Sequence, residues 1–235
     1  MNVIITGASK GIGFQIARSF VLAGDNKLGL TARSSVSCEQ LKQENTSPGP
    51  EIISYPFDLD RLIEYPRKLA ERIYHDFDHV DILINNAGFL VNKPFMELQA
   101  EDYTKSYRIN FLAPALLIRE LVPLLSKSSI RHIVNISSMG GYQGSKKFTG
   151  LAAYSSSKAA LSNLTESLAV ELKDMDIHVN CLALGAVQTE MLSQAFPNIK
   201  APVSPDEMGK FIYHFAIEAG KVMNGKVIPV SLSIP

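Results

Sequence analysis

Several features that would mark other classes of protein are scarce or missing in this chain. Its 235 residues carry a formal net charge of +0, so neither a nucleic-acid partner nor an anionic membrane surface is indicated. The two cysteines, Cys38 and Cys181, form no CxxC pattern and no disulfide scaffold, and we expect free thiols in a reducing compartment. No apolar run reaches the roughly 18 residues that a membrane-spanning helix needs. Together these absences predict a cytoplasmic protein.

A metal site, a leader peptide and an internal linker are not indicated either. The histidines show no ligand spacing beyond His75 and His79, which stand near an expected helix end. The first strand-like run follows Met1 directly, without a basic flank or a cleavage site. No repeat or low-complexity stretch divides the chain, and 46% hydrophobic with 20% charged residues is an ordinary globular balance. We therefore expect a single domain over residues 1–235.

Short apolar runs alternate with longer helical patterns along the chain. The runs that predict strands are residues 2–6, 28–32, 52–55, 80–85, 131–137, 177–183 and 227–230. Helices are predicted over 14–23, 38–44, 59–77, about 100–125, a segment that carries Tyr154 and Lys158, and 205–218. Pro229 places the last strand at an edge or near a strand end. The alternation predicts an α/β fold with a parallel sheet that helices cover on both faces.

The longest stretch without a clear pattern is residues 189–204, which is rich in proline and polar residues. In such sheets, ligands bind beyond the C-terminal ends of the strands, and this stretch follows the sixth predicted strand. We therefore interpret it as a substrate loop or lid, with structural filler as the alternative.

Three glycines, Gly7, Gly11 and Gly13, stand between the first predicted strand and the first helix. Glycines at such a turn let the backbone approach a pyrophosphate, which the free N–H groups and the dipole of the helix N-terminus stabilise. An ordinary strand-to-helix turn is the alternative. In this context the spacing predicts a dinucleotide site.

The end of the second strand indicates which dinucleotide is bound. NAD sites carry an acidic residue about 20 residues past the glycines, and the stretch Leu30-Thr31-Ala32-Arg33-Ser34 has none. The Arg33 guanidinium suits a 2′-phosphate, and Lys10 could reach the same group. These residues favour NADP(H) over NAD(H), the alternative being two solvated surface cations.

Tyr154 and Lys158 are four residues apart on a predicted helix, so their side chains share one face. An unperturbed phenol, with a pKa of about 10, is a poor proton donor or acceptor near neutral pH. A neighbouring ammonium favours the phenolate and lowers that pKa. The pair is a candidate proton-transfer device, although a packed Tyr and a solvated Lys remain the alternative for an isolated pair.

Five motifs stand in order along the chain. They are Thr6-Gly7-Ala8-Ser9-Lys10-Gly11-Ile12-Gly13, Asn85-Asn86-Ala87-Gly88, Asn110, Ile136-Ser137-Ser138 and Tyr154-x-x-x-Lys158. With these motifs the chain resembles a compact short-chain dehydrogenase/reductase over nearly its whole length, with NADPH-dependent carbonyl and 3-oxoacyl reductases among the relatives. The resemblance implies a single-domain, doubly wound Rossmann-type sheet of about seven strands. It also implies a dinucleotide-binding catalytic domain that acts on a small-molecule carbonyl or alcohol.

The resemblance assigns roles to single residues. Tyr154 would donate a proton to the carbonyl oxygen, while Lys158 would bind the nicotinamide ribose and depress the pKa of Tyr154. Ser138, in preference to Ser137, would hold the substrate oxygen, and Asn110 would hold a water that links Lys158 to solvent. Asp58 would bond the adenine. The remaining implied cofactor contacts are Gly7, Ser9, Lys10, Gly11, Ile12, Gly13, Arg33, Leu59, Asn86, Ala87, Gly88, Gly185, Val187 and Thr189.

The position of Pro114 supports the role of Asn110 independently. If one helix runs through both residues, Pro114 has no N–H to give to the carbonyl of Asn110, which is then free to bind water. A proline that only kinks a packed helix is an equally good reading.

Two departures from the family pattern affect the lid and the assembly. Leu184 stands where relatives usually have a proline, which leaves the turn after the sixth strand less rigid. An Asp-Gly-Gly turn is absent near the C-terminus, where many relatives build a subunit interface. We expect a homodimer or homotetramer. An interface or a buried core face explains equally well the apolar residues Leu112, Ala115, Leu116, Leu121, Leu124 and Leu125.

The substrate is not readable from the sequence. It would be shaped by residues 89–96, 139–153 and the lid. The stretch between Ser138 and Tyr154 holds Lys146, Lys147 and Phe148, and its two lysines could attract an anionic substrate or carrier, although a solvated loop is the better reading. The competing functions are a non-catalytic NADP-binding regulator and a sugar-nucleotide epimerase or dehydratase. The glycine spacing and the chain length argue against the epimerase.

Overall fold

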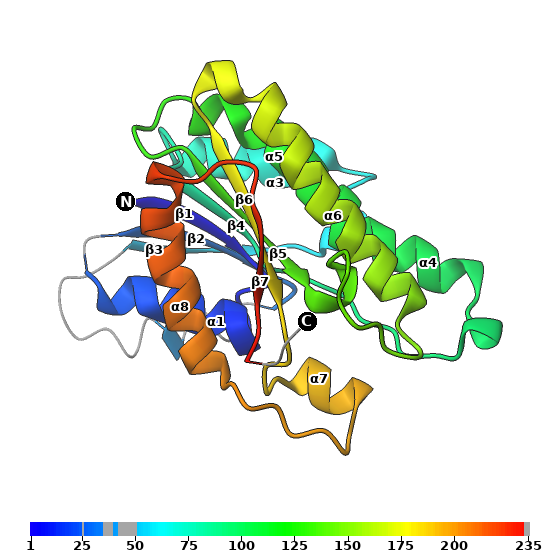
Figure 1. The fold of residues 1–235 in the computed structure, drawn as a ribbon. Helices are drawn as coiled ribbons and strands as arrows, with labels where there is room; N and C mark the ends of the chain where they lie inside the picture. The colour runs from blue at the N-terminus through cyan, green and yellow to red at the C-terminus, as the bar shows by residue number, and fades with distance from the viewer. Residues whose placement is uncertain (25, 35–39, 42–50, 233–235) are drawn as a thin grey trace.

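Seven parallel strands lie side by side in one sheet, in the order β3-β2-β1-β4-β5-β6-β7 (Figure 1). The computed structural model describes residues 1–24, 26–34, 40–41 and 51–232. The chain winds outward from β1 through β2 to β3, returns to the other side of β1, and continues from β4 to β7. This is the doubly wound Rossmann-type sheet that the alternation and the motifs predict. The strands are β1 (Asn2–Thr6), β2 (Lys27–Ala32), β3 (Glu51–Pro56), β4 (Ile82–Asn85), β5 (His132–Ser138), β6 (His178–Leu184) and β7 (Val227–Val230).

Helices cover both faces of the sheet (Figure 1). Alternate residues of β1 show why, because Val3 and Ile5 pack into one core cluster and Ile4 packs into the other. On the first face lie α1 (Gly11–Leu22) and α8 (Pro205–Glu218). On the second face lie α3 (Pro66–Asp76), α5 (Ala113–Leu125) and α6 (Ala152–Glu171).

The predicted helix over 59–77 is in fact two separate elements. A single 3-10 turn, η1 (Leu59–Arg61), is followed by α3, which begins at Pro66. Tyr65 has φ −132° and ψ 62°, because the ring of the following proline disfavours helical backbone at the preceding residue. Pro66 costs the helix no hydrogen bond, because the N–H group at the first helical position has no partner within the helix.

The predicted helix over about 100–125 is also interrupted. It consists of α4 (Ala100–Tyr107), a π-helical turn η3 (Arg108–Leu112), and α5. Pro114 stands at the start of α5, so the break coincides with the proline that the sequence places four residues after Asn110. Of the apolar residues that could have formed an interface, Leu121, Leu124 and Leu125 are buried in the core.

A short helix, α7 (Glu190–Ala195), lies inside the stretch that the sequence leaves without a pattern. The remaining short turns are η2 (Phe95–Glu97), η4 (Met139–Gly141), η5 (Lys173–Met175) and η6 (Ala219–Lys221). The predicted helix over 38–44 lies almost entirely outside the described residues, as does Cys38. Cys181 is a free, buried thiol.

The C-terminal elements agree with the prediction. Ser204 caps α8 in a capping box with Glu207, and Pro205 stands in the first turn. Pro229 lies in β7, which is an edge strand. Within the described ranges, no helix is both long and apolar enough to cross a membrane.

Candidate active site

The glycine loop between β1 and α1 takes a shape that side chains would prevent. Gly7 and Gly11 have φ angles of 68° and 58°, where glycine is favoured. A Cβ atom on Gly13 would lie 2.3 Å from the carbonyl oxygen of Gly7, so only glycine fits there. Helix α1 begins at Gly11, and its N-cap Lys10 makes no side-chain capping bond. Its first N–H groups are thus free to face an anion, which fits a dinucleotide pyrophosphate.

Asn86, which follows β4, holds this loop in place. Its side-chain amide donates to the carbonyl oxygens of Thr6 at 3.0 Å and Gly7 at 3.2 Å. The hydroxyl of Thr6 in turn accepts the backbone N–H groups of Asn86 and Ala87, both at 3.1 Å. The sequence predicts Asn86 and Ala87 as cofactor contacts but misses Thr6, whose hydroxyl joins the ends of β1 and β4.

The cations expected to bind a 2′-phosphate lie in different surroundings. Arg33 is exposed just past β2, and no hydrogen bond or ion pair involves it within the described residues. Lys10 forms an ion pair with Glu190, the first residue of α7, with 2.6 Å between Nζ and Oε2. Both side chains are more than half exposed. Asp58 is exposed, and its carboxylate accepts the N–H of Asp60 at the start of η1, beside the buried Leu59.

Ser138 and Tyr154 meet where β5 ends and α6 begins. A hydrogen bond with Ser138 lowers the pKa of Tyr154, but burial of the phenol outweighs it and raises the pKa above its usual value of 10. The Ser137 hydroxyl is directed elsewhere and donates to the carbonyl oxygen of Lys158 at 2.8 Å. Between the two candidate serines, it is therefore Ser138 that lies beside Tyr154.

Lys158 lies one helical turn after Tyr154 and is almost completely buried, with 3% of its surface exposed. Its Nζ donates to the carbonyl oxygen of Ile136 at 2.7 Å. Burial lowers the pKa of the ammonium to about 8. The expectation that Lys158 depresses the pKa of Tyr154 differs from what is found here, since the lowering influence comes from Ser138 and the net direction is upward.

Asn110 joins three parts of the site through its side chain. Its Oδ1 accepts the N–H of Phe89 at 2.7 Å, and its Nδ2 donates to the carbonyl oxygen of Phe89 at 2.8 Å. The same Nδ2 donates to the hydroxyl of Ser157 on α6 at 2.9 Å. Gly88 stands beside this junction, because a Cβ on it would lie 3.5 Å from both Asn110 Oδ1 and Lys158 Nζ. The structure thus brings Asn110, Gly88 and Lys158 together. Sequence reasoning misses Ser157, since three successive serines give no signal to choose one.

The segment after β6 lies against the glycine loop. Thr189 caps α7 by accepting the N–H of Leu192, and its methyl group would be 3.6 Å from a Cβ on Gly11. Val187 is buried and pairs with Val203. Gly185 donates its N–H to the carbonyl oxygen of Val230 at 2.8 Å, directly after Leu184. The end of β6 is therefore fixed by β7 without the proline that relatives carry.

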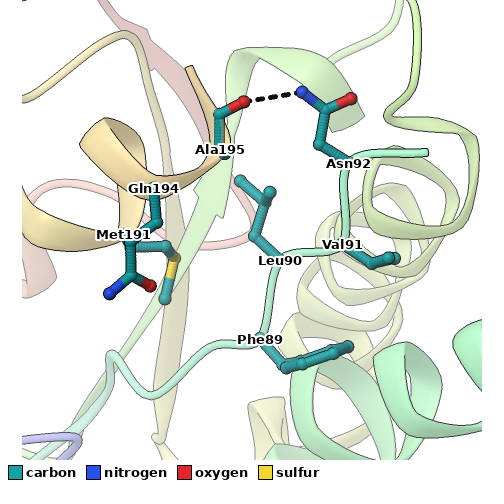
Figure 2. Close-up of a pocket in the computed structure, with 7 residues that line it drawn as sticks. All are labelled: Phe89, Leu90, Val91, Asn92, Met191, Gln194 and Ala195. Carbon is teal, nitrogen blue, oxygen red and sulfur yellow. Dashed lines mark hydrogen bonds between the residues drawn. The ribbon is translucent and has the colours of Figure 1, made fainter. Parts of the chain in front are cut away.

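A pocket of about 290 Å³ opens between α7 and the segment that follows Gly88 (Figure 2). Its rim is bridged where the side-chain amide of Asn92 donates to the carbonyl oxygen of Ala195 at 2.7 Å. It is lined by Phe89, Leu90, Val91, Asn92, Met191, Gln194 and Ala195. No group of three or more His, Cys, Asp or Glu side chains in the described part of the chain could hold a metal ion.

The sequence model of the family described as short chain dehydrogenase matches residues 1–200. The chain belongs to the short-chain dehydrogenase family. This is an oxidoreductase family, and the match spans the glycine loop, the Asn86 segment, Asn110, Ser138 and the Tyr154–Lys158 pair.

Individual members of the short-chain dehydrogenase family resemble this chain over most of its length. A fatty acyl-CoA reductase of Acinetobacter baylyi is 30% identical over 93% of this chain and 73% of its own length. The 3-oxoacyl-[acyl-carrier-protein] reductase FabG of Aquifex aeolicus is 28% identical over 97% of this chain and 94% of its own. In structure, the NADP complex of RhlG from Pseudomonas aeruginosa is 27% identical, with a TM-score of 0.84 over 98% of this chain and 94% of its own.

Proposed function

We propose that this short-chain dehydrogenase is an NADP(H)-dependent oxidoreductase that interconverts a carbonyl group and an alcohol, with Tyr154 as general acid and base. The observation that carries the proposal is that Ser138 lies beside the phenol of Tyr154, one helical turn from the buried Lys158. Two hydroxyl groups that face one point can hold one substrate oxygen. When bound, a nicotinamide cofactor supplies a hydride to the carbonyl carbon or accepts one from the alcohol carbon.

The residues then divide the remaining work. The hydroxyls of Ser138 and Tyr154 donate to the substrate oxygen, on which negative charge develops during reduction. Tyr154 transfers its Oη proton to that oxygen and is reprotonated from solvent. Because burial raises the pKa of Tyr154, the phenol is protonated near neutral pH, which is the state that the reductive direction requires. Lys158 places an ammonium beside the expected position of the ribose hydroxyls.

Support for NADP(H) comes from Arg33 and from the NADP-bound relative. Arg33 stands at the end of β2 without a partner among the described residues, and no acidic residue follows in the stretch through Ser34. A free guanidinium is suited to a phosphate in two-pronged geometry.

We also propose that the protein forms a homodimer or homotetramer, since the apolar residues Leu112, Ala115 and Leu116 are only half-buried.

The deciding experiment replaces Tyr154 with Phe, which removes the proton and keeps the ring. We expect Tyr154→Phe to abolish NADPH consumption on every carbonyl that the wild type reduces and to leave NADPH binding nearly unchanged. The substrate panel comprises β-ketoacyl thioesters, steroids, sugars and small diketones. Tyr213→Phe is the matched control, since that tyrosine belongs to α8 and packs on Phe20 of α1.

Two outcomes would count against the proposal. Turnover that survives in Tyr154→Phe would eliminate this residue as the acid. Tight NADPH binding without turnover on any carbonyl would favour the alternative, a non-catalytic NADP-binding regulator of the same fold.

A further inference from the structure

The pocket between α7 and residues 89–92 adjoins the proposed reaction site. Phe89 follows Gly88, whose Cα would carry a Cβ 3.5 Å from Lys158 Nζ. Asn110 holds the backbone of Phe89 by two hydrogen bonds and reaches Ser157 on α6 with the same side chain. The wall of the pocket therefore begins at Phe89, the residue after Gly88, which lies beside Lys158. The hydrogen bonds from Asn110 fix the backbone of Phe89. A substituent on the reacting carbonyl can extend from there toward α7.

The polar side chains that line this pocket are already engaged with the protein. Asn92 donates its amide to the carbonyl oxygen of Ala195 at 2.7 Å. Gln194 donates its amide to the carboxylate of Glu190 at 2.8 Å, along α7. No charged side chain is among the lining residues. Neither amide N–H group that makes these bonds is free to bind a substrate.

The apolar side chains of the lining present hydrocarbon and thioether groups to the pocket. Leu90 extends from its loop toward α7, and Met191 extends from α7 toward that loop (Figure 2). Val91 and Ala195 complete the apolar lining. The volume of about 290 Å³ has room for roughly ten water-sized groups at about 30 Å³ each. This is more space than a methyl group needs.

We infer that the substrate carries an uncharged hydrocarbon chain on its carbonyl carbon, and that this chain lies between Leu90 and Met191. The inference rests on the proposed function and adds the substrate class to it. A hydrocarbon chain gains from leaving water in such a pocket. A polyhydroxylated chain of the same length between Leu90 and Met191 would lose water from several hydroxyls, and neither of these two side chains offers an N–H or O–H group in exchange, which weakens binding.

A series of straight-chain methyl ketones from 2-butanone to 2-octanone, with D-fructose as the hydroxylated counterpart of 2-hexanone, tests the inference. We expect kcat/KM to rise on the order of fourfold with each methylene until the pocket is filled. We expect 2-hexanone to exceed D-fructose by on the order of a hundredfold when the D-fructose concentration is counted as its open-chain keto form alone. Met191→Gln should flatten the rise, whereas Met223→Gln, at a comparably exposed methionine beside η6, should keep it.

A binding measurement separates this inference from the proposed function. By calorimetry on the NADP⁺-saturated protein, we expect 1-octanol to bind and D-sorbitol not to bind, and Met191→Gln to weaken 1-octanol about tenfold. A flat ketone series, or D-fructose preferred to 2-hexanone, overturns the substrate class while reduction of 2,3-butanedione leaves the proposed function standing. If no carbonyl is reduced, the two alcohols still decide what the pocket accepts.

Discussion

Arg33 and Lys10 differ in whether their side chains already form an ion pair before a cofactor binds. Arg33 is exposed, and no hydrogen bond or ion pair of its side chain is found in the described ranges. Lys10 already holds Glu190 at 2.6 Å, across 180 positions of sequence. A phosphate would be bound by Arg33 without any prior contact being lost, whereas Lys10 would have to leave a carboxylate. Arg33 is therefore the residue whose replacement should change cofactor preference most.

Arg33→Asp should lower the affinity for NADPH on the order of ten- to hundredfold, because a charge-assisted hydrogen bond contributes about 1.5–3 kcal/mol. The introduced carboxylate should also raise the affinity for NADH, since it can accept the 2′-hydroxyl. Fluorescence titration with both cofactors measures the change. Arg67→Asp is the control, because Arg67 lies on α3 with 80% of its side chain exposed. Equal affinities before and after the Arg33 change would refute the assignment.

At the residue scale, sequence reasoning finds what adjacent strand ends bring together. Ser138 and Tyr154 lie close together, because Ser138 is the last residue of β5 and Tyr154 lies in the first turn of α6, at the same edge of the sheet. It does not find Lys10–Glu190, nor the bond from Asn110 to Ser157. Those pairs depend on how α7 and η3 sit in three dimensions, and no local spacing encodes that.

Among the elements, the π-helical turn η3 is what presents Asn110 to its partners. The side chain of Asn110 is fully buried. It forms hydrogen bonds with the N–H and the carbonyl oxygen of Phe89 and with the hydroxyl of Ser157. Ser157 in turn donates to the carbonyl oxygen of Tyr154 at 2.7 Å. The turn therefore connects the loop after β4 to the part of α6 that carries Tyr154. π-helical turns of this kind are frequently found at functional sites.

Ser157→Ala should disturb this connection, because Asn110 loses one acceptor in a buried place. We expect the free energy of unfolding to fall by about 1–3 kcal/mol. If Ser157 also positions Tyr154, kcat should fall about tenfold and the pH profile of kcat should shift, which stopped-flow and steady-state assays would measure.

Ser156→Ala is the control for this experiment. Among the described residues its hydroxyl bonds only to the carbonyl oxygen of Ala153 in the same helix, so both kcat and stability should stay nearly unchanged. If Ser157→Ala loses stability but keeps the wild-type kcat and pH profile, Ser157 is a structural residue alone.

The element boundaries show where periodicity stops being informative. Each strand lies within two residues of its predicted limits, and for the inner strands the reason is that continuous apolar runs mark strands that are buried on both faces. The breaks at Pro66 and at η3 are missed because the apolar spacing continues through them. Helix α7 has six residues, too few for a helical period to emerge from a polar, proline-rich stretch. Element type and order are thus predictable, whereas interruptions need the packed structure.

For the whole molecule, one buried histidine makes stability depend on pH. His132, at the start of β5, is fully buried, with Nδ1 2.8 Å from the carbonyl oxygen of Ala216 and Nε2 3.1 Å from Asn180 Nδ2. The carbonyl can only accept, so Nδ1 carries the proton and Nε2 accepts from Asn180. Burial lowers the pKa of His132 from 6.5 to about 4. The folded protein thus keeps this ring neutral where the unfolded chain is protonated.

Stability should therefore fall as pH falls through the unfolded pKa. Because the folded pKa is the lower one, the contribution of His132 is complete above about pH 6.5 and is lost progressively toward pH 4. The slope is about 1.4 kcal/mol per pH unit, so about 2 kcal/mol should be lost between pH 6.5 and pH 5. Urea unfolding at several pH values measures this loss.

A variant without the buried histidine gives the comparison. His132→Asn should be less stable at neutral pH and should show a shallower slope, whereas the exposed His214→Asn should keep the slope of the wild type. Identical slopes in all three proteins would show that His132 is not the group that titrates.

The strand order affects how the chain folds during synthesis. β1 is the first of these strands to be made but lies inside the sheet, between β2 and β4, and its pairing with β4 joins Val3 to Ile82. Until β4 has been synthesised, one edge of β1 has backbone groups without strand partners, and such an edge can associate with other chains. Closing a contact across so many residues also costs loop entropy and slows folding. Before β4 emerges, the nascent chain can therefore build only β3-β2-β1, and we expect it to need protection from aggregation until β4 has been made.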